Sequence, residues 1–248
     1  MSACIIRGLR KGFCLNGKES NVLKGIDLRL EAGSFVSLVG YSGCGKSTFL
    51  RILLGLTTLD GGSVRFEGME GRRAIVFQEP RLIRSKTVGQ NLLLALHHCP
   101  VREQKETVVE SVLCILGLSA FRNAYPHQLS GGMAQRIALG RALCRQPELL
   151  LMDEPFGALD ALTRQNLQQE LLRIYLEQKM TVLFVSHDVS EAVFLSQRVL
   201  VMKDGDFVRD IPVDLPYPRD TGSPEFIAIQ NDVHSCIVSN NYSKRRIV

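Results

Sequence analysis

Residues 40–48 read GYSGCGKST and match the spacing G-x-x-x-x-G-K-[ST]. They follow the apolar run FVSLV at 35–39 and precede TFLRILLGL, which has the pattern of a helix. Glycines let such a loop wrap so that successive backbone N–H groups point inward, and the next helix adds the positive end of its dipole. The segment therefore predicts a strand, loop and helix that cradle phosphate groups, as part of an α/β fold.

The side chains of this loop suit a nucleoside triphosphate and a divalent cation. Lys46 supplies a mobile positive charge for the β- and γ-phosphates, and the Ser47 hydroxyl is a hard oxygen of the kind that Mg²⁺ prefers. We expect nucleotide contacts along the whole loop, at Gly40, Tyr41, Ser42, Gly43, Cys44, Gly45, Lys46, Ser47 and Thr48.

Other short apolar runs predict the remaining strands of a sheet. They lie at 74–77, 149–152, 182–185 and 199–202. Several of the runs are apolar at every position, so both faces of these strands should be buried, as in a parallel sheet with helices on each side.

Two helices are expected beside these strands. In residues 162–178, the positions Leu167, Leu171, Ile174 and Gln178 fall on one stripe. A second helix should start at Asp188, whose side chain caps the first turn while Glu191 reaches back toward it.

The chain also predicts a division into subdomains. Residues 88–145 have few strand-like runs and are expected to form a helical subdomain inserted into an α/β core of residues 1–87 and 146–210. Residues 211–248 contain four prolines in their first half and predict an irregular extension with a short helix from Pro224.

Polar side chains follow three of the predicted strands. Asp153 and Glu154 end the run LLLMDE, Gln78 follows AIVF, and His187 follows VLFVS. Because the carboxyl ends of parallel strands share one edge, we expect these residues to lie near the phosphate loop. There Asp153 would complete the Mg²⁺ shell with Ser47, and Gln78 would either ligate the ion or hold the attacking water. Glu154 would orient and deprotonate that water, and His187 would contact the γ-phosphate and orient the base.

A second anion site is predicted at Ser130-Gly131-Gly132, which opens a helical stretch. One phosphate loop does not need a second cradle in the same chain. We therefore hypothesise two subunits arranged head to tail, each covering the nucleotide bound by the other.

These motifs resemble those of ATP-binding cassette (ABC) ATPases. GYSGCGKST, Gln78, LSGGMAQR, LLLMDEP, GALD and His187 stand in the order of the family's Walker A, Q-loop, signature, Walker B, D-loop and switch-histidine motifs. The resemblance implies a RecA-like P-loop core with an antiparallel β edge and a helical subdomain. It also implies that Phe13 stacks on adenine and that Asp160 makes a contact across a homodimer. The signature residues that would contact the second subunit's ATP are Leu129, Ser130, Gly131, Gly132 and Gln135.

A narrower likeness is to the nitrate, sulfonate and taurine branch of bacterial importers. It is carried by VFQEPRLIRSKTV, FGALDALTR and VDLPYPRD. It implies two membrane permeases as partners, a periplasmic binding protein that delivers substrate, and a permease contact over residues 78–91. The chain departs from the branch at Arg84-Ser85, Tyr41 and Gly140.

Composition limits the remaining possibilities. The chain has 248 residues, a net charge of +5 and no apolar run of membrane-spanning length. Its positive residues are scattered apart from Lys244-Arg245-Arg246, which we interpret as a solvated tail, so no nucleic-acid partner is expected. The seven cysteines form no C-x-x-C pair and are expected to be mostly buried in a reducing compartment. With no signal sequence in the N-terminal residues, we expect a peripheral protein on the cytoplasmic face of the inner membrane.

Three alternatives remain open at this stage. An exporter or another class of importer could also use a separate ATPase chain. A soluble cassette acting on DNA would need a long coiled coil, and a ribosomal one usually has two cassettes; neither feature is present in the sequence. A kinase or GTPase would leave Ser130-Gly131-Gly132 without a role, and no N-K-x-D motif is present.

Overall fold

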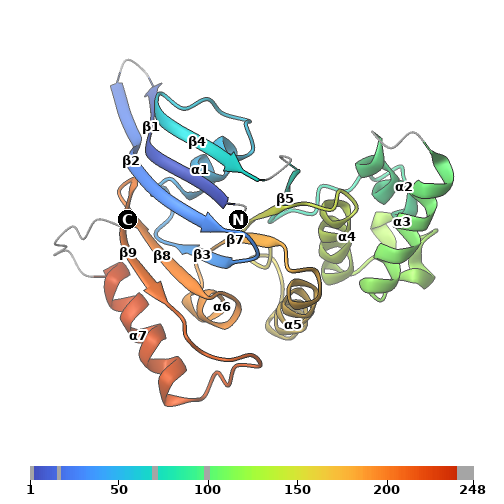
Figure 1. Cartoon of the computed structure of the whole chain (residues 1–248). Coiled ribbons are helices and arrows are strands. Elements are labelled where there is room, and N and C mark those ends of the chain that lie inside the picture. Colours follow the sequence, from blue (N-terminus) through green and yellow to red (C-terminus); the bar gives the residue numbers. More distant parts are fainter. Residues whose placement is uncertain (1–2, 16–17, 69–71, 98–100, 239–248) are drawn as a thin grey trace. The chain divides into compact units, whose positions relative to one another are not determined.

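The structure is a computed structural model that describes residues 3–15, 18–68, 72–97 and 101–238 (Figure 1). These residues form two compact units, one of Met1–Gly71 with Met180–Val248 and one of Arg72–Lys179. The predicted helical subdomain, 88–145, lies wholly within the second unit, and its boundaries stay a prediction. The basic run at 244–246 lies outside the described residues.

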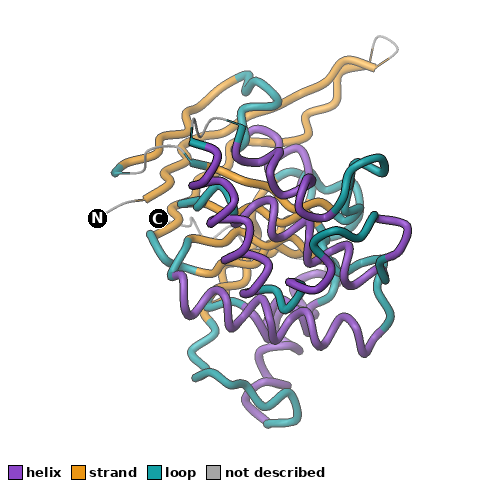
Figure 2. Tube along the Cα trace, turned by 90° about the vertical axis from the view of Figure 1, so that its right-hand side faces the viewer, coloured by secondary structure: helices purple, strands orange, loops and turns teal. Residues whose placement is uncertain are grey.

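The first unit contains an antiparallel sheet of three strands. Its order is β2 (Lys18–Glu31), β1 (Ala3–Leu15) and β4 (Gly61–Glu67). The long ribbon of β1 and β2 is visible in Figures 1 and 2. Cys4, Ile6, Leu28 and Leu30 are buried, because they alternate along the two strands on one face.

The same unit contains parallel strands of the expected kind. β7 (Thr181–Ser186), β3 (Phe35–Val39) and β8 (Arg198–Lys203) run parallel, and β9 (Asp206–Pro212) pairs antiparallel with β8. Every residue of β3 and β7 is buried, as their unbroken apolar composition predicts.

Three helices complete the first unit: α1 (Lys46–Leu53), α6 (Val189–Leu195) and α7 (Pro224–Val238). A core of apolar side chains from β3, α6, α7, β8 and β9 joins these elements. The predicted start of the last helix at Pro224 is confirmed, but the helix has 15 residues and is not short. Its interior has no proline or glycine to stop it, and Phe226, Val233 and Cys236 anchor one face.

The second unit pairs β5 (Arg73–Phe77) with β6 (Leu149–Asp153) in parallel. β6 is buried except for Asp153, whereas burial alternates along β5. The expectation that both faces are buried is therefore wrong for β5.

Helix α5 (Ala161–Gln178) follows the strand pair and buries Leu167, Leu171 and Ile174 as predicted. Gln178 is exposed, contrary to the predicted stripe, because it is the last helical residue. Leu172 and Tyr175 are buried in addition, so the apolar face is wider than the prediction.

Every described element between residues 88 and 145 is helical, as predicted (Figures 1 and 2). These elements are α2 (Val88–Leu93), η1 (Leu94–Leu96), α3 (Arg102–Ile115), η2 (Ser119–Phe121), η3 (Pro126–Gln128) and α4 (Gly131–Leu143).

Gly140 allows close packing in this segment. A Cβ at Gly140 would lie 2.7 Å from Leu116 Cδ1 and 3.0 Å from Leu92 Cδ2. The missing methyl group therefore lets side chains from α2 and from the end of α3 approach α4 closely.

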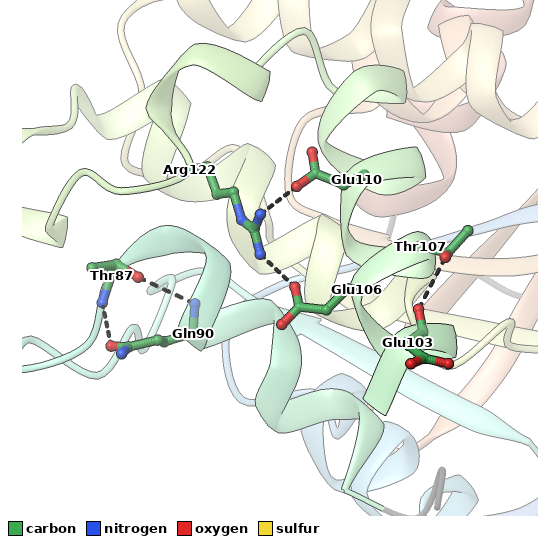
Figure 3. Close-up of polar contacts among 7 residues, drawn as sticks. All are labelled: Thr87, Gln90, Glu103, Glu106, Thr107, Glu110 and Arg122. Atoms are coloured by element: carbon green, nitrogen blue, oxygen red, sulfur yellow. Dashed lines mark hydrogen bonds and ion pairs between the residues drawn. The ribbon is translucent and has the colours of Figure 1, made fainter. Parts of the chain in front are cut away.

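Arg122 joins several parts of the helical segment (Figure 3). Its guanidinium group contacts the carboxylates of Glu106 and Glu110 on α3, and its carbonyl accepts the N–H of Gly89 at 2.8 Å. Helix α2 begins with a capping box, in which Thr87 and Gln90 bond reciprocally (Figure 3). Arg122 thus links the start of α2 to α3 through polar contacts.

The cysteines agree with the expectation in part. Cys4, Cys44, Cys144 and Cys236 are buried, Cys14 and Cys114 are exposed, and Cys99 lies outside the described residues. Burial raises the pKa of the Cys144 thiol to about 12, so this residue is a packed apolar group.

No helix within the described ranges has both the length and the apolar character needed to cross a bilayer.

Candidate functional site

The predicted phosphate loop connects β3 to α1 in the first unit. Its last glycine, Gly45, is the N-cap of α1 with φ 113°, and Gly43 has φ 82°. Both values lie in the left-handed region that only glycine adopts readily. At Gly40, a Cβ would lie 2.3 Å from the carbonyl oxygen of Met202, so no larger residue fits there. The loop conformation therefore requires the glycines that the motif supplies.

Lys46 is held inside the loop. Its ammonium group donates to the carbonyls of Gly40, at 2.7 Å, and Tyr41, at 3.0 Å, and only 6% of the residue is exposed. A buried lysine with carbonyl partners is oriented and available to exchange them for phosphate oxygens.

The other loop residues divide by exposure. Tyr41, Ser42, Gly43 and Ser47 are exposed, Thr48 is half-buried, and Cys44 and Gly45 are buried. Burial raises the pKa of the Cys44 thiol, while the charge of Lys46 opposes this increase. Cys44 is thus a neutral packing residue, and any nucleotide contact from it comes through its backbone.

Phe13, the residue implied for adenine, lies on β1 opposite Ser20. Its side chain is 40% exposed, and the ammonium group of Lys11 lies 5.3 Å from the ring centroid. Lys11 also pairs with Asp60, which accepts the N–H of Gly12. Phe13 is therefore an exposed ring on an ordered strand and not a core residue.

His187 follows β7 and is exposed, while its neighbours are tightly bonded. The Ser186 hydroxyl accepts the N–H of Asp188 at 2.9 Å and donates to the buried carboxylate of Glu191 at 2.7 Å. Asp188 caps α6, as predicted. Glu191 bonds to the Ser186 hydroxyl, which in turn accepts the N–H of the cap residue Asp188. The sequence pattern did not single out Ser186, and a direct bond from Glu191 to the cap stays a prediction. These bonds fix the backbone on both sides of the histidine.

In the second unit, Gln78 and the two acidic residues follow neighbouring strands. Phe77 pairs with Asp153 in the parallel register, so Gln78 and Glu154 are the next residues along each strand. A Cβ at Gly157 would lie 2.9 Å from Gln78 Nε2, which places the amide against the turn after β6. The structure therefore brings Gln78 next to the turn that contains Glu154.

Glu154 has φ 48°, a left-handed backbone conformation that is strained for a glutamate. It precedes Pro155, and its carbonyl accepts the N–H of Gly157 at 3.1 Å. Asp153 and Glu154 are both half-buried. Two consecutive carboxylate residues therefore lie at the end of one strand, where the chain makes a sharp turn.

Ser130-Gly131-Gly132 forms the start of α4, as predicted. Ser130 is the N-cap and its hydroxyl accepts the N–H of Met133 at 3.2 Å; Ser130 and Gly131 are exposed, and Leu129 is half-buried. A Cβ at Gly132 would lie 2.5 Å from Thr163 Cγ2 of α5. The first glycine thus leaves the helix start open to a ligand, and the second permits close packing of two helices.

Gln135, one turn further along α4, is buried. Its side-chain amide donates to the carbonyl of Phe77 at 2.9 Å and its exposed fraction is 4%. It therefore connects the signature helix to the strand end beside Gln78. The contact with a second subunit's nucleotide stays a prediction.

Asp160 is exposed at the start of α5, where its carboxylate accepts the N–H of Thr163 at 3.0 Å. This bond holds the pKa of Asp160 below its usual value. Its contact across a dimer also stays a prediction, as does the common sheet edge that would bring the two units' residues to one nucleotide.

The fold and the phosphate loop define a P-loop nucleotide-binding protein, and an anion-binding role for the start of α4 stays a prediction. A family model described as ABC transporter matches residues 23–157, which include the phosphate loop, Gln78, the signature and the Asp153-Glu154 pair. The chain belongs to the ABC transporter family. It is an ATPase of this family and binds ATP.

Two curated relatives illustrate the similarity. The chain is 44% identical over 230 residues to the aliphatic sulfonates import ATP-binding protein of Rhodopseudomonas palustris, covering 92% of this chain and 80% of that protein. It is 40% identical over 244 residues to the nitrate import ATP-binding protein of Synechococcus elongatus, covering 92% of this chain and 37% of that protein.

A solved structure gives the same result for the fold. It is a dimeric ATP-binding cassette in a post-hydrolysis state bound to ADP and Pi, 30% identical, with a TM-score of 0.74 over 86% of this chain and 100% of that one. The predicted α/β cassette, with parallel strands and an antiparallel β portion, is confirmed.

Proposed function

We propose that this protein is the ATP-hydrolysing subunit of an importer for a small anion, such as an aliphatic sulfonate, taurine or nitrate. The observation that carries the proposal is the loop around Lys46, whose buried ammonium and left-handed glycines form a phosphate cradle. The similarity to sulfonate and nitrate import proteins supports the anion class.

The site residues suit Mg²⁺-dependent hydrolysis. Ser47, Gln78 and Asp153 are oxygen donors of the kind that Mg²⁺ selects, and they would hold the ion beside the phosphates. The ion would supply charge neutralisation for phosphoryl transfer when bound.

Glu154 is proposed as the general base. Its carboxylate is half-buried and lies one residue beyond Asp153, the proposed metal ligand, on a backbone in the left-handed conformation. His187 would contact the γ-phosphate, since Ser186 and Asp188 hold the backbone on both sides of its exposed ring.

A head-to-tail homodimer would complete the site. Ser130 and Gly131 present an exposed helix start that suits the γ-phosphate bound by another subunit. ATP would then join the two chains, and hydrolysis would release them. The dimeric cassette with ADP and Pi supports a dimer, and the head-to-tail orientation is part of the proposal.

The remaining partners are two permease subunits and, indirectly, a periplasmic substrate-binding protein. This places the chain peripherally on the cytoplasmic face of the inner membrane. The exposed Arg84 and Ser85, on the segment 78–91, are candidates for the permease contact.

Glu154→Gln tests the hydrolytic role. Glutamine retains the shape but is not a base, so the variant should bind ATP, hydrolyse it at least about 100-fold more slowly and accumulate as a dimer in ATP. Turnover by a phosphate-release assay and mass by light scattering are the measurements. Undiminished turnover would place the base elsewhere.

Transport assays test the substrate. The chain, assembled with its permeases and binding protein in vesicles, should consume ATP faster with one of the candidate sulfonates, taurine or nitrate. Stimulation only by a cation or a neutral sugar would contradict the anion class.

A further inference from the structure

The turn between β8 and β9 contacts the backbone of the phosphate loop. Lys203 and Asp206 pair across the hairpin, so Asp204 and Gly205 form its two-residue loop. Their φ values are 49° and 81°, which is the type I′ geometry that an Asp-Gly pair favours.

Gly205 makes one backbone hydrogen bond to each of two other segments. Its N–H donates to the carbonyl of Cys44 at 3.1 Å, and its carbonyl accepts the N–H of Lys24, on β2, at 2.8 Å. One residue thus links the phosphate loop to the antiparallel sheet that carries Phe13.

The packing at this point excludes any side chain. A Cβ on Gly205 would lie 2.2 Å from the carbonyl oxygen of Val22, and one on Gly45 would lie 3.0 Å from the same atom. Because the obstacle is backbone, it cannot turn aside as a flexible side chain would. The turn, the loop and β2 therefore meet around a single carbonyl group.

The bond to Cys44 has a consequence for phosphate binding. A trans peptide points its C=O and the next N–H in opposite directions. Holding the Cys44 carbonyl toward Gly205 therefore turns the Gly45 N–H away from the hairpin. As the N-cap of α1, Gly45 donates no intrahelical bond, so its N–H is one of the groups that an anion at the helix start would use.

We propose that Gly205 is a positioning residue for the phosphate site, which locks the Cys44–Gly45 peptide in its anion-binding orientation. The inference rests on the proposed role of residues 40–48 as the ATP phosphate loop. It assigns to a hairpin about 160 residues further along the chain a share in ATP affinity.

Gly205→Ala and Gly205→Asn test the proposal together. Both add the Cβ that meets Val22, whereas asparagine tolerates a left-handed backbone better than alanine. Both variants should bind ATP about tenfold more weakly by calorimetry, because one oriented hydrogen bond is lost. Full recovery in the asparagine variant would show that backbone strain alone matters and would overturn the proposal.

Gly55→Ala is the matched control. Gly55 has φ 74°, but nothing lies within 4 Å of its Cβ position. It should lose thermal stability through the same backbone strain while keeping wild-type ATP affinity. Wild-type affinity in both Gly205 variants would also overturn the proposal.

Amide hydrogen exchange on the wild-type chain covers the case in which the variants do not fold. A non-hydrolysable ATP analogue should slow exchange at residues 203–206 together with 40–48. Protection of the loop alone would contradict the proposal. Lys46→Ala tests the phosphate loop separately from the role of Gly205. Unchanged ATP affinity in that variant would show that residues 40–48 are not the phosphate site.

Discussion

At the scale of single residues, two adjacent glycines in the signature segment serve different purposes. Gly131 has room for a side chain, since the nearest atom to its Cβ position is Leu159 Cδ2 at 3.6 Å. Gly132 has none, because Thr163 Cγ2 is 2.5 Å away. Glycine is unfavourable for helix formation. At Gly132 the close packing against α5 compensates for this cost.

Gly132→Ala should therefore lower the free energy of unfolding by about 1–3 kcal/mol through overpacking. Gly131→Ala, which meets only an ordinary contact, should change it little. Thr163→Ser removes Cγ2 but keeps the hydroxyl, so it should restore stability when combined with Gly132→Ala. Urea unfolding measures all four chains, and a double variant no more stable than Gly132→Ala would contradict this account.

At the scale of elements, helix ends are fixed by specific side chains. Ser130, Asp160 and Asp188 cap α4, α5 and α6, each with a side-chain oxygen that accepts a backbone N–H. Each of these caps lies in or next to a predicted site. These capping residues therefore end the preceding loops and also fix the backbone beside the predicted sites.

Asp160 combines a cap with a proposed dimer contact, and two variants separate the roles. Asp160→Ala should lower the melting temperature, whereas Asp160→Asn keeps a capping oxygen and should retain it. If the charge is needed across the dimer, Asp160→Asn should still lose ATPase activity at an unchanged melting temperature.

The pH dependence of the Asp160 cap has a definite sign. The N–H of Thr163 lowers the pKa of the folded carboxyl, so the stabilisation is present above the unfolded pKa of about 3.9 and is lost as pH falls through the lower folded pKa. The difference in melting temperature between wild type and Asp160→Ala should shrink below about pH 4. A difference that grows on acidification would contradict the assignment.

Arg219 binds backbone carbonyl groups at the carboxyl end of α6. The residue is 7% exposed, and its guanidinium group donates to carbonyls of Val193, Phe194 and Ser196, while two further bonds reach Val213 and Leu215. Positive charge at a helix carboxyl end also favours the dipole. The segment after β9 is therefore held on α6 although it has no regular structure.

Arg219→Ala should lower the free energy of unfolding by about 2–4 kcal/mol, because several buried carbonyls lose a charged donor. Arg219→Lys should recover only part of the loss, since one ammonium group does not reproduce the planar fork. Arg209→Ala is the control, as Arg209 and Asp232 are exposed and 4.0 Å apart. A loss no larger in Arg219→Ala than in the control would refute this role.

At the scale of the whole molecule, the proposed reaction needs two chains. Lys46 belongs to one compact unit and Ser130 to the other, and the head-to-tail hypothesis puts them at one nucleotide only in different subunits. Ser130→Arg should leave ATP binding to a single chain intact and abolish hydrolysis. Lys46→Ala should abolish hydrolysis through lost binding.

Mixing these two inactive variants tests the arrangement. In a heterodimer one composite site carries both changes and the other carries neither, so about a quarter of the wild-type sites should return in an equal mixture. ATPase activity and native mass spectrometry are measured together. Heterodimers without any activity would contradict the shared site.

Much of this protein could be predicted because its signals are local. β3 and β7 are apolar at every position, and burial on both faces follows from that composition alone. Gln178 and β5 were mispredicted because periodicity does not reveal where a helix is covered or which face of a strand packs.

The sequence by itself determined the phosphate loop, the predicted strands, the cap at Asp188 and the family, since each depends on the order of neighbouring residues. Only the tertiary structure decided why Gly132, Gly140 and Gly205 must be glycine, and that Arg219 binds the end of α6. In each case, segments that are far apart in the chain approach closely in the fold. A glycine has no side chain, so its place in the sequence gives no pattern that would reveal which segment packs against it.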